Sequence, residues 1–219
     1  MKKSKVIRIF IGIGFIMAFI AWTLLVCLVD VKAIGPQGSS VGLATLNGAF
    51  HELTEDNITL YIITDWLGLV PIATALGFAI LGLIQLIKRQ SIAKVDVSIL
   101  ALGVFYIAVI AVYLLFEEVV INYRPILISG NLEASYPSST TMLVTCVMPT
   151  ALMQFNVRIK QKPLRYAISA IIIAFIAFMV IGRLISGVHW LSDIIGGALI
   201  SIGLVTAYSA FLGTPSKSK

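Results

Sequence analysis

The chain has 219 residues, of which 59% are hydrophobic and only 12% are charged, and its formal net charge is +6. Soluble domains carry about a quarter of their residues as charged ones, so this composition excludes an ordinary soluble protein. The basic residues lie beside long apolar segments, which indicates membrane topology and no nucleic-acid partner. With two cysteines and two histidines, the chain gives no sign of a disulfide framework, a metal site or another cofactor.

Apolar residues occur in blocks long enough to cross a bilayer, which takes about 20 residues of helix. We therefore expect an all-α integral membrane protein, a six-helix bundle that forms a single domain over residues 1–219. The fourth block contains Thr145, Pro149 and Gln154, so it is expected inside the bundle and away from lipid. The predicted spans are Val6–Val29, Trp66–Ile87, Val97–Phe116, Ser138–Val157, Tyr166–Gly182 and Trp190–Leu212.

The first block follows three lysines, as a cleavable signal peptide would. It is too long for a signal core and has no small-residue cleavage site before Asp30, so we expect a retained anchor. Residues 31–65 form the longest polar connection and are expected to be an outer loop. Within it, the spacing of Leu46, Phe50 and Leu53 predicts a short interfacial helix.

The distribution of basic residues predicts the orientation, because cytoplasmic loops are enriched in lysine and arginine. Of the 16 Lys and Arg residues, only Lys32, Arg124 and Arg183 fall on the outer side if both termini are cytoplasmic. Acidic residues divide the other way, with Asp96 the one acidic residue near the cytoplasmic face. The predicted cytoplasmic basic residues are Lys2, Lys3, Lys5, Arg8, Lys88, Arg89, Lys94, Arg158, Lys160, Lys162, Arg165, Lys217 and Lys219.

His189 and Asp193 stand at the start of the last predicted span. Four residues apart on a helix, they share one face, so the aspartate can accept a hydrogen bond from one ring nitrogen. The other nitrogen is then free to act as a nucleophile. The same pair also fits a histidine in the interfacial belt beside Trp190, followed by an aspartate that the helix dipole stabilises.

Arg124 and Arg183 follow the third and fifth predicted spans on the outer side, where basic residues are otherwise nearly absent. Their planar guanidinium groups suit a phosphate, although each arginine also fits an interfacial anchor. The fourth span opens with the hydroxyl residues Ser138, Ser139 and Thr140. A helix N-terminus with added hydroxyl donors can bind an anion, and the same residues also fit ordinary helix capping.

Together these segments resemble the type 2 phosphatidic acid phosphatase family. That family carries Lys-(six residues)-Arg-Pro, then Pro-Ser-Gly-His, then Ser-Arg-(five residues)-His-(three residues)-Asp. The order and spacing of the motifs agree, and the six-span plan is similar to that of bacterial membrane members. The matching residues are Arg124 and Pro125 for the first motif, Pro137 and Ser138 for the second, and Arg183, His189 and Asp193 for the third.

The resemblance implies a metal-independent phosphohydrolase that acts on lipid phosphates through a phosphohistidine, at the outer face of a multi-pass protein of the bacterial cell membrane. His189 would be the nucleophile and Asp193 would orient it. Arg124, Ser138 and Arg183 would hold the phosphoryl oxygens.

The chain departs from the family motifs at several positions. Glu117 stands where the family has lysine, and a carboxylate repels phosphate. Ser139 and Thr140 replace the glycine and histidine of the second motif, and Gly182 replaces a serine. The family histidine protonates the leaving group, which threonine cannot do. A general acid is worth about 10²- to 10⁴-fold in rate, so its replacement bears directly on the substrate.

A leaving group that needs no proton would tolerate Thr140. The conjugate acid of a simple alkoxide has a pKa near that of water, about 15.7, whereas a leaving phosphate has a second pKa of about 6. A polyprenyl diphosphate cut to its monophosphate would meet this condition. His51 in the outer loop is an alternative proton donor, but its spacing does not link it to the motifs, and a lone histidine there is expected at the surface.

Three classes of function fit the sequence. The first is a lipid phosphatase or diphosphatase, and the second is a catalytically impaired relative that binds lipid phosphates, as Glu117 and Thr140 suggest. The third is a small membrane transporter, because charged residues near membrane helices can mark substrate paths. No charged residue lies near the centre of any predicted span, which disfavours the transporter.

Overall fold

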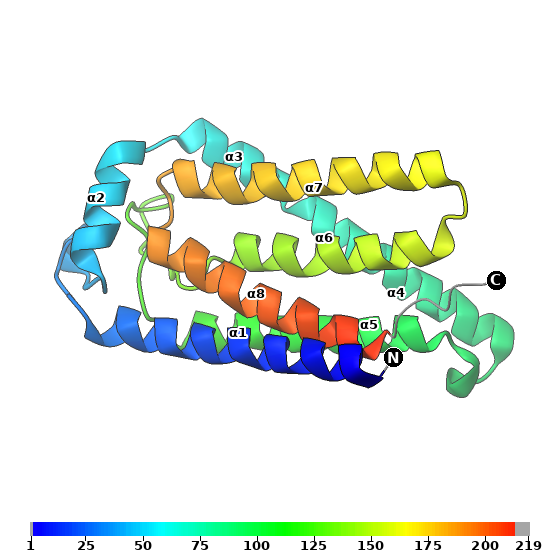
Figure 1. Ribbon diagram of the computed structural model, residues 1–219. Helices are drawn as coiled ribbons and strands as arrows, with labels where there is room; N and C mark the ends of the chain where they lie inside the picture. Colours follow the sequence, from blue (N-terminus) through cyan, green and yellow to red (C-terminus); the bar gives the residue numbers. More distant parts are fainter. Residues whose placement is uncertain (1, 213–219) are drawn as a thin grey trace.

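The computed structural model describes residues 2–212, and this part of the chain is helical and contains no strand. Six helical segments are long and apolar enough to cross a membrane, which confirms the predicted all-α, multi-pass class. Figure 1 shows them side by side as a bundle. The helices are α1 Lys2–Leu28, α2 Ala44–Thr54, α3 Ile58–Leu67, α4 Leu69–Arg89, α5 Val97–Glu118, α6 Ser139–Arg158, α7 Lys162–Ile185 and α8 Leu191–Phe211, with short 3-10 helices at Pro36–Gly38 and Ile92–Lys94.

Helix α6 lies at the centre of the bundle, as its polar residues predicted. It packs against α4, α5, α7 and α8, and half of its apolar window is buried, against a fifth or less in α1 and α4. Its polar side chains find partners inside the protein. Gln154 donates to the Tyr208 hydroxyl at 2.9 Å, and the hydroxyls of Tyr106 and Thr150 are 3.2 Å apart. Lipid offers no such partners, so these residues favour a central position.

Helices α1 and α8 pack along one another at close range. A β-carbon added to Gly12 would lie 3.1 Å from the Gly203 carbonyl, and one added to Gly203 would lie 3.2 Å from the Gly12 carbonyl. Small residues facing one another allow the backbones of membrane helices to approach closely. Because α8 begins beside the candidate site, this contact helps to fix its position relative to the first span.

The predicted outer loop over residues 31–65 is too long, and the second span begins earlier than Trp66. Helix α3 starts at Ile58, where the Asn57 side chain accepts a hydrogen bond from Leu60 N at 2.9 Å, and it runs almost directly into α4. The sequence prediction placed the polar pair Thr64 and Asp65 outside the span. The structure pairs Asp65 with Arg183 of α7 instead, so its charge is compensated within the helix. The structure has a helix, α2, over the residues where a short helix was predicted, and its place at the membrane interface stays a prediction.

The remaining boundaries differ by a few residues. Ser138 precedes α6 as its N-cap and is not its first residue, and α7 extends from Lys162 to Ile185, so Arg183 lies within the helix. Helices α1 and α7 begin at one end of the bundle, while α6 and α8 begin at the other, where α2 also lies (Figure 1). Lys217 and Lys219, which contributed to the predicted orientation, lie outside the described residues.

Candidate active site

The loops at the α2 end of the bundle bring the predicted site residues together. The turn between α7 and α8 packs against the chain that follows α2, and Asn57 N donates to the Ser186 carbonyl at 3.0 Å. Gly187 in this turn has φ +73°, and a β-carbon there would lie 2.0 Å from the Glu55 carbonyl oxygen. Both the backbone conformation and the close approach therefore require glycine. This turn presents His189.

His189 is almost completely buried against Arg124, with Arg124 Nη1 3.2 Å from His189 Nε2. A guanidinium group can only donate, so Nε2 must accept, and the imidazole is neutral with its proton on Nδ1. Burial lowers the pKa of His189 well below its ordinary value of 6.5, and the charges of Arg124 and Arg183 lower it further. Nε2, the ring nitrogen of His189 that carries the free electron pair, thus faces Arg124.

Asp193 faces the other side of the imidazole and is fully buried. Its Oδ2 lies 3.6 Å from His189 Nδ1, slightly beyond hydrogen-bond distance, and accepts a hydrogen bond from Trp190 N at 3.0 Å. Asp193 therefore caps the start of α8 and faces the imidazole. The backbone carbonyl of Asp193 accepts a hydrogen bond from Ser138 N at 3.0 Å, and this bond joins the starts of α6 and α8.

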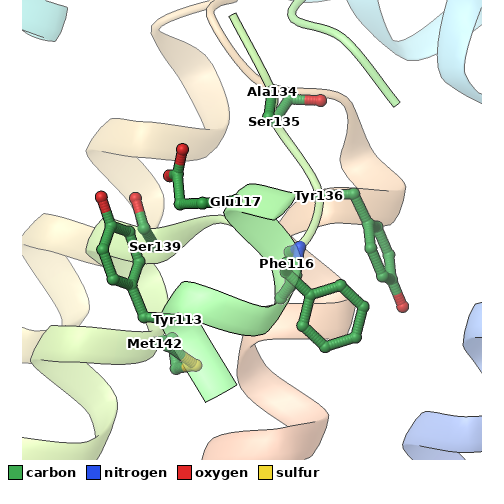
Figure 2. Close-up of a pocket in the computed structure, with 9 residues that line it drawn as sticks. Tyr113, Phe116, Glu117, Ala134, Ser135, Tyr136, Ser139 and Met142 are labelled. Carbon is green, nitrogen blue, oxygen red and sulfur yellow. The ribbon is translucent and has the colours of Figure 1, made fainter. Parts of the chain in front are cut away.

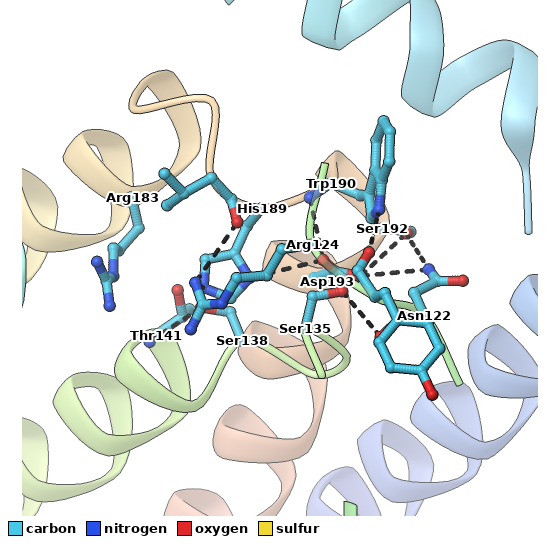
Figure 3. A network of polar contacts seen from close by, with 12 residues as sticks. Asn122, Arg124, Ser135, Ser138, Thr141, Arg183, His189, Trp190, Ser192 and Asp193 are labelled. Carbon is cyan, nitrogen blue, oxygen red and sulfur yellow. Dashed lines mark hydrogen bonds and ion pairs between the residues drawn. The ribbon is translucent and has the colours of Figure 1, made fainter. Parts of the chain in front are cut away.

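Two buried asparagines that the sequence did not single out, Asn122 (Figure 3) and Asn47, support this aspartate directly or through Ser192. Asn122 donates to Asp193 Oδ1 at 3.3 Å and accepts from Gly42 N at 3.2 Å. Asn47 of α2 donates to Ser192 Oγ at 2.9 Å and accepts from Ser192 N at 3.0 Å. Asn122 lies in the loop between α5 and α6 and Asn47 lies in α2, and neither belongs to a recognisable motif spacing. Through them, the segment that contains α2 is connected to the carboxylate that faces His189.

Arg183 is the largest fully buried side chain, and its guanidinium group is held by α3 and α6. One nitrogen, Nη2, lies 3.1 Å from Asp65 Oδ1 and 2.6 Å from Thr140 Oγ1. The ring of Tyr61 lies 4.9 Å from the Arg183 guanidinium carbon and 6.0 Å from that of Arg124. Sequence reasoning missed Tyr61 and Asp65 because it assigned both to a loop. Their spacing of four residues, which puts them on one face of a helix, was the available signal.

The start of α6 lies beside these arginines. Ser138 is fully buried, and its hydroxyl accepts a hydrogen bond from Thr141 N at 3.4 Å. By helix geometry the N–H groups of Ser139 and Thr140 have no carbonyl acceptor within α6, so they remain available to an anion. The Thr140 side chain contacts Arg183, whereas Figure 2 shows the Ser139 side chain beside Glu117 and Tyr113 in a narrow crevice.

Glu117 and His51 lie outside the cluster of arginines and histidine. Glu117 is exposed near the end of α5, and among the described residues it forms no ion pair with Arg124 or Arg183. His51 is only half-buried, and its ring packs 5.5 Å from that of Trp190. Its Nε2 lies 3.6 Å from Asp56. Between residues 2 and 212, no group of three His, Cys, Asp or Glu side chains is arranged to hold a metal ion.

Residues 118–216 match the model of the PAP2 superfamily, and this region contains every predicted site residue. This match supports the type 2 phosphatase family. Among solved structures, the chain is similar to the crystal structure of a transmembrane PAP2 type phosphatidylglycerolphosphate phosphatase from Bacillus subtilis. The two share 18% sequence identity with a TM-score of 0.56, over 95% of this chain and 98% of that one. No match was found among curated proteins.

The structural similarity establishes a shared fold along nearly the whole chain. The match to the PAP2 superfamily model supports phosphatase activity in an integral membrane protein, and the arrangement of the site is compatible with it. Figure 3 shows Arg183 on one side of His189 and Arg124, with Asp193 and Asn122 on the other. A buried histidine, two arginines and an aspartate therefore lie together at one end of the helix bundle.

Proposed function

We propose that the protein is a metal-independent lipid phosphohydrolase that transfers the phosphoryl group of its substrate to His189 and then to water. The observation that carries the proposal is the contact between the Nε2 of a neutral, buried histidine and Arg124, with Arg183 nearby. A neutral imidazole keeps the electron pair that a nucleophile needs. The two guanidinium groups provide the fixed positive charge that phosphoryl transfer requires.

The roles of the other residues follow from their contacts. Arg124 and Arg183 would bind the phosphoryl oxygens, together with the free N–H groups of Ser139 and Thr140. The Ser138 hydroxyl accepts one hydrogen bond and can still donate another. Asp193 would stabilise the charge that develops on the imidazole as Nε2 attacks, because its carboxylate faces Nδ1.

An apolar cavity supports a lipid substrate. It has a volume of about 570 Å³ and lies between α4, α5 and α6, with Thr140 and Ser139 at its polar edge and Leu76, Tyr106 and Val147 among its walls. A cavity of about 150 Å³ holds the six carbons of benzene, so this one has room for roughly 20 carbons. A hydrocarbon chain in the cavity would place an attached phosphate close to Thr140 and thus to Arg183.

The lack of a proton donor at Thr140 favours a diphosphate substrate over a monophosphate substrate. Thr140 cannot supply a proton, and its hydroxyl is engaged by Arg183. A lipid monophosphate is a much weaker base than an alkoxide, so it can leave from a diphosphate without a proton donor. We therefore infer a single-chain lipid diphosphate, such as a polyprenyl diphosphate, that is cut to its monophosphate.

The decisive experiment is phosphate release by the purified protein from matched lipid monophosphates and diphosphates in the presence of a metal chelator. We expect release from diphosphates, a slower reaction with monophosphates, and loss of both reactions in the variant His189→Gln. A requirement for added metal, or a preference for monophosphates, would contradict the mechanism or the leaving-group argument respectively.

We further propose that the site faces outward and that both termini are cytoplasmic, because basic residues concentrate at the opposite end of the bundle. In a variant that lacks the exposed Cys27, a membrane-impermeant thiol reagent should label Asn131→Cys in intact cells. It should label Lys160→Cys only after lysis. Both new positions are exposed in the structure, so the reverse pattern would overturn the orientation.

A catalytically impaired relative is the second candidate, and ion pairs of the two arginines favour it. Arg124 Nε lies 3.0 Å from Glu133 Oε2, and Arg183 pairs with Asp65, so a phosphate must compete with two carboxylates. Such a protein would bind lipid diphosphate without releasing phosphate. Binding that depends on Arg183, with no phosphohistidine and no turnover, would identify this function.

A further inference from the structure

The second half of the proposed reaction lacks an obvious proton acceptor. Water must attack phosphorus to release the phosphoryl group from His189, and a base that takes its proton accelerates this step. In the PAP2 motif this position carries a histidine, whereas here Thr140 has no basic group at ordinary pH. The first half-reaction needs no acid if its leaving group is a phosphate. The second half-reaction still needs a group that activates water.

A carboxylate that is not part of the sequence motifs lies next to Thr140. Asp65 Oδ1 and Thr140 Oγ1 contact the same nitrogen of Arg183, at 3.1 Å and 2.6 Å. The carboxylate therefore lies at the same end of the guanidinium group as the residue that replaces the histidine. The Asp65 side chain is 57% exposed, so water can reach it, whereas the Arg183 side chain is 2% exposed.

The position of Asp65 also suits the direction of attack. In an in-line displacement, water approaches phosphorus from the side opposite the nitrogen that leaves. Glu133 pairs with Arg124, which touches His189 Nε2 directly, so this carboxylate lies on the side of the leaving nitrogen. Asp65 contacts the second arginine, which lies away from Asp193 and Asn122 in Figure 3.

We propose that Asp65 is the general base that activates water for hydrolysis of the phosphohistidine, and this inference rests on the proposed function. The Asp65 carboxylate takes one proton as the water oxygen bonds to phosphorus. The bond between phosphorus and His189 Nε2 breaks, and its electron pair returns to the nitrogen. Inorganic phosphate is released, and the proton on Asp65 passes to solvent, which restores the starting state.

The variant Asp65→Asn separates this role from a purely structural one. An asparagine oxygen still accepts a hydrogen bond from Arg183, but an amide cannot take a proton from water. In a rapid-quench experiment with a prenyl diphosphate labelled in its terminal phosphate, we expect phosphorylation of His189 to stay within about twofold of wild type. Hydrolysis of the phosphohistidine should slow by about 100-fold, so this intermediate should accumulate.

Two further variants complete the test. Asp65→Glu keeps a carboxylate and should retain faster hydrolysis than Asp65→Asn. Glu52→Gln removes an exposed carboxylate from α2 at the same end of the bundle and should leave both steps unchanged. If Asp65→Asn slows both steps equally, Asp65 only positions Arg183, and if it slows neither step, Asp65 has no role in the reaction. Either result would show that the inference is wrong. A wild-type protein that forms no phosphohistidine would overturn the proposed function itself, and with it this role.

Discussion

The two ends of the helix bundle both gather arginines around a carboxylate, but they do so in opposite environments. At the end where α1 begins, Asp96 accepts from Gln85 at 2.9 Å and pairs with Arg89 at 3.0 Å and Arg158 at 3.4 Å. These charged side chains are about a third exposed. At the other end, Arg183, His189 and Asp193 are each at most 3% exposed.

Solvent access gives the two clusters different properties. The hydrogen bond from Gln85, followed by those from Arg89 and Arg158, lowers the pKa of Asp96, so the ion pairs stabilise a surface junction of α4, α5 and α6. In the buried cluster, Arg183 Nε and His189 Nδ1 have no hydrogen-bond partner among the described residues. Buried donors without partners are costly, and a bound phosphate can satisfy guanidinium donors. The comparison supports a structural role for the exposed cluster and is consistent with the proposed reaction at the buried one.

The largest effect should come from His189. The variant His189→Gln should lower the rate of phosphate release by more than about 1000-fold, since removal of a nucleophile disables the whole reaction path. The matched exchange His51→Gln, at the same end of the bundle, should leave the rate within about twofold. Initial rates on a lipid diphosphate measure both. A comparable loss in the His51 variant would return this residue to consideration as the proton donor.

The second-largest effect should come from exchange of an arginine for lysine, and it should be confined to the end of the bundle that contains His189. Arg183→Lys retains the charge but replaces the planar guanidinium group, whose separate nitrogens can contact Asp65, Thr140 and a phosphate together, by a single nitrogen. We therefore expect kcat/KM to fall by about 100-fold. Arg158→Lys at the opposite end should change kcat/KM by no more than about twofold. Equal losses in the two variants would remove the distinction between a reactive and a structural cluster.

Loss of the hydrogen bond that Asn122 donates to Asp193 should have a moderate effect. Asn122→Leu removes a hydrogen bond to the carboxylate, and bonds to charged groups are worth about 1.5–3 kcal/mol, so kcat should fall by roughly 10- to 100-fold. KM should change little, because Asn122 contacts the aspartate and not the arginines. Asn131→Leu, in an exposed loop, is the matched control. A raised KM with unchanged kcat would show that Asn122 shapes substrate binding instead.

The smallest effect should be found at Asp96. Because its folded-state pKa is lowered, its stabilising contribution is present above its unfolded pKa and is lost as pH falls through its folded-state range. Asp96→Asn should therefore lower the melting temperature by a few degrees at neutral pH, with phosphate release unchanged. The difference from wild type should shrink on acidification. A difference that grows toward low pH would contradict this sign.

The sequence predicted the number of membrane-spanning segments and the residues that match spaced motifs, because six apolar blocks and a histidine four residues before an aspartate are local signals. It did not predict Tyr61 and Asp65 as site residues. Their polarity suggested a loop, and only the partner Arg183, 118 residues away, makes Asp65 compatible with a helix. Asn47 and Asn122 were missed for a related reason. Small polar residues outside spaced motifs acquire a role only when folding brings them to Ser192 and Asp193.

The most direct test of the central claim is identification of the covalent intermediate. Wild-type protein should be mixed briefly with lipid diphosphate labelled in its terminal phosphate at about pH 6, below the ordinary histidine pKa of about 6.5, and then denatured in alkali. Because the pKa of His189 is lowered, its imidazole should still be neutral and reactive at this pH. We predict label on the peptide that contains His189. Turnover without label on this residue would contradict the account.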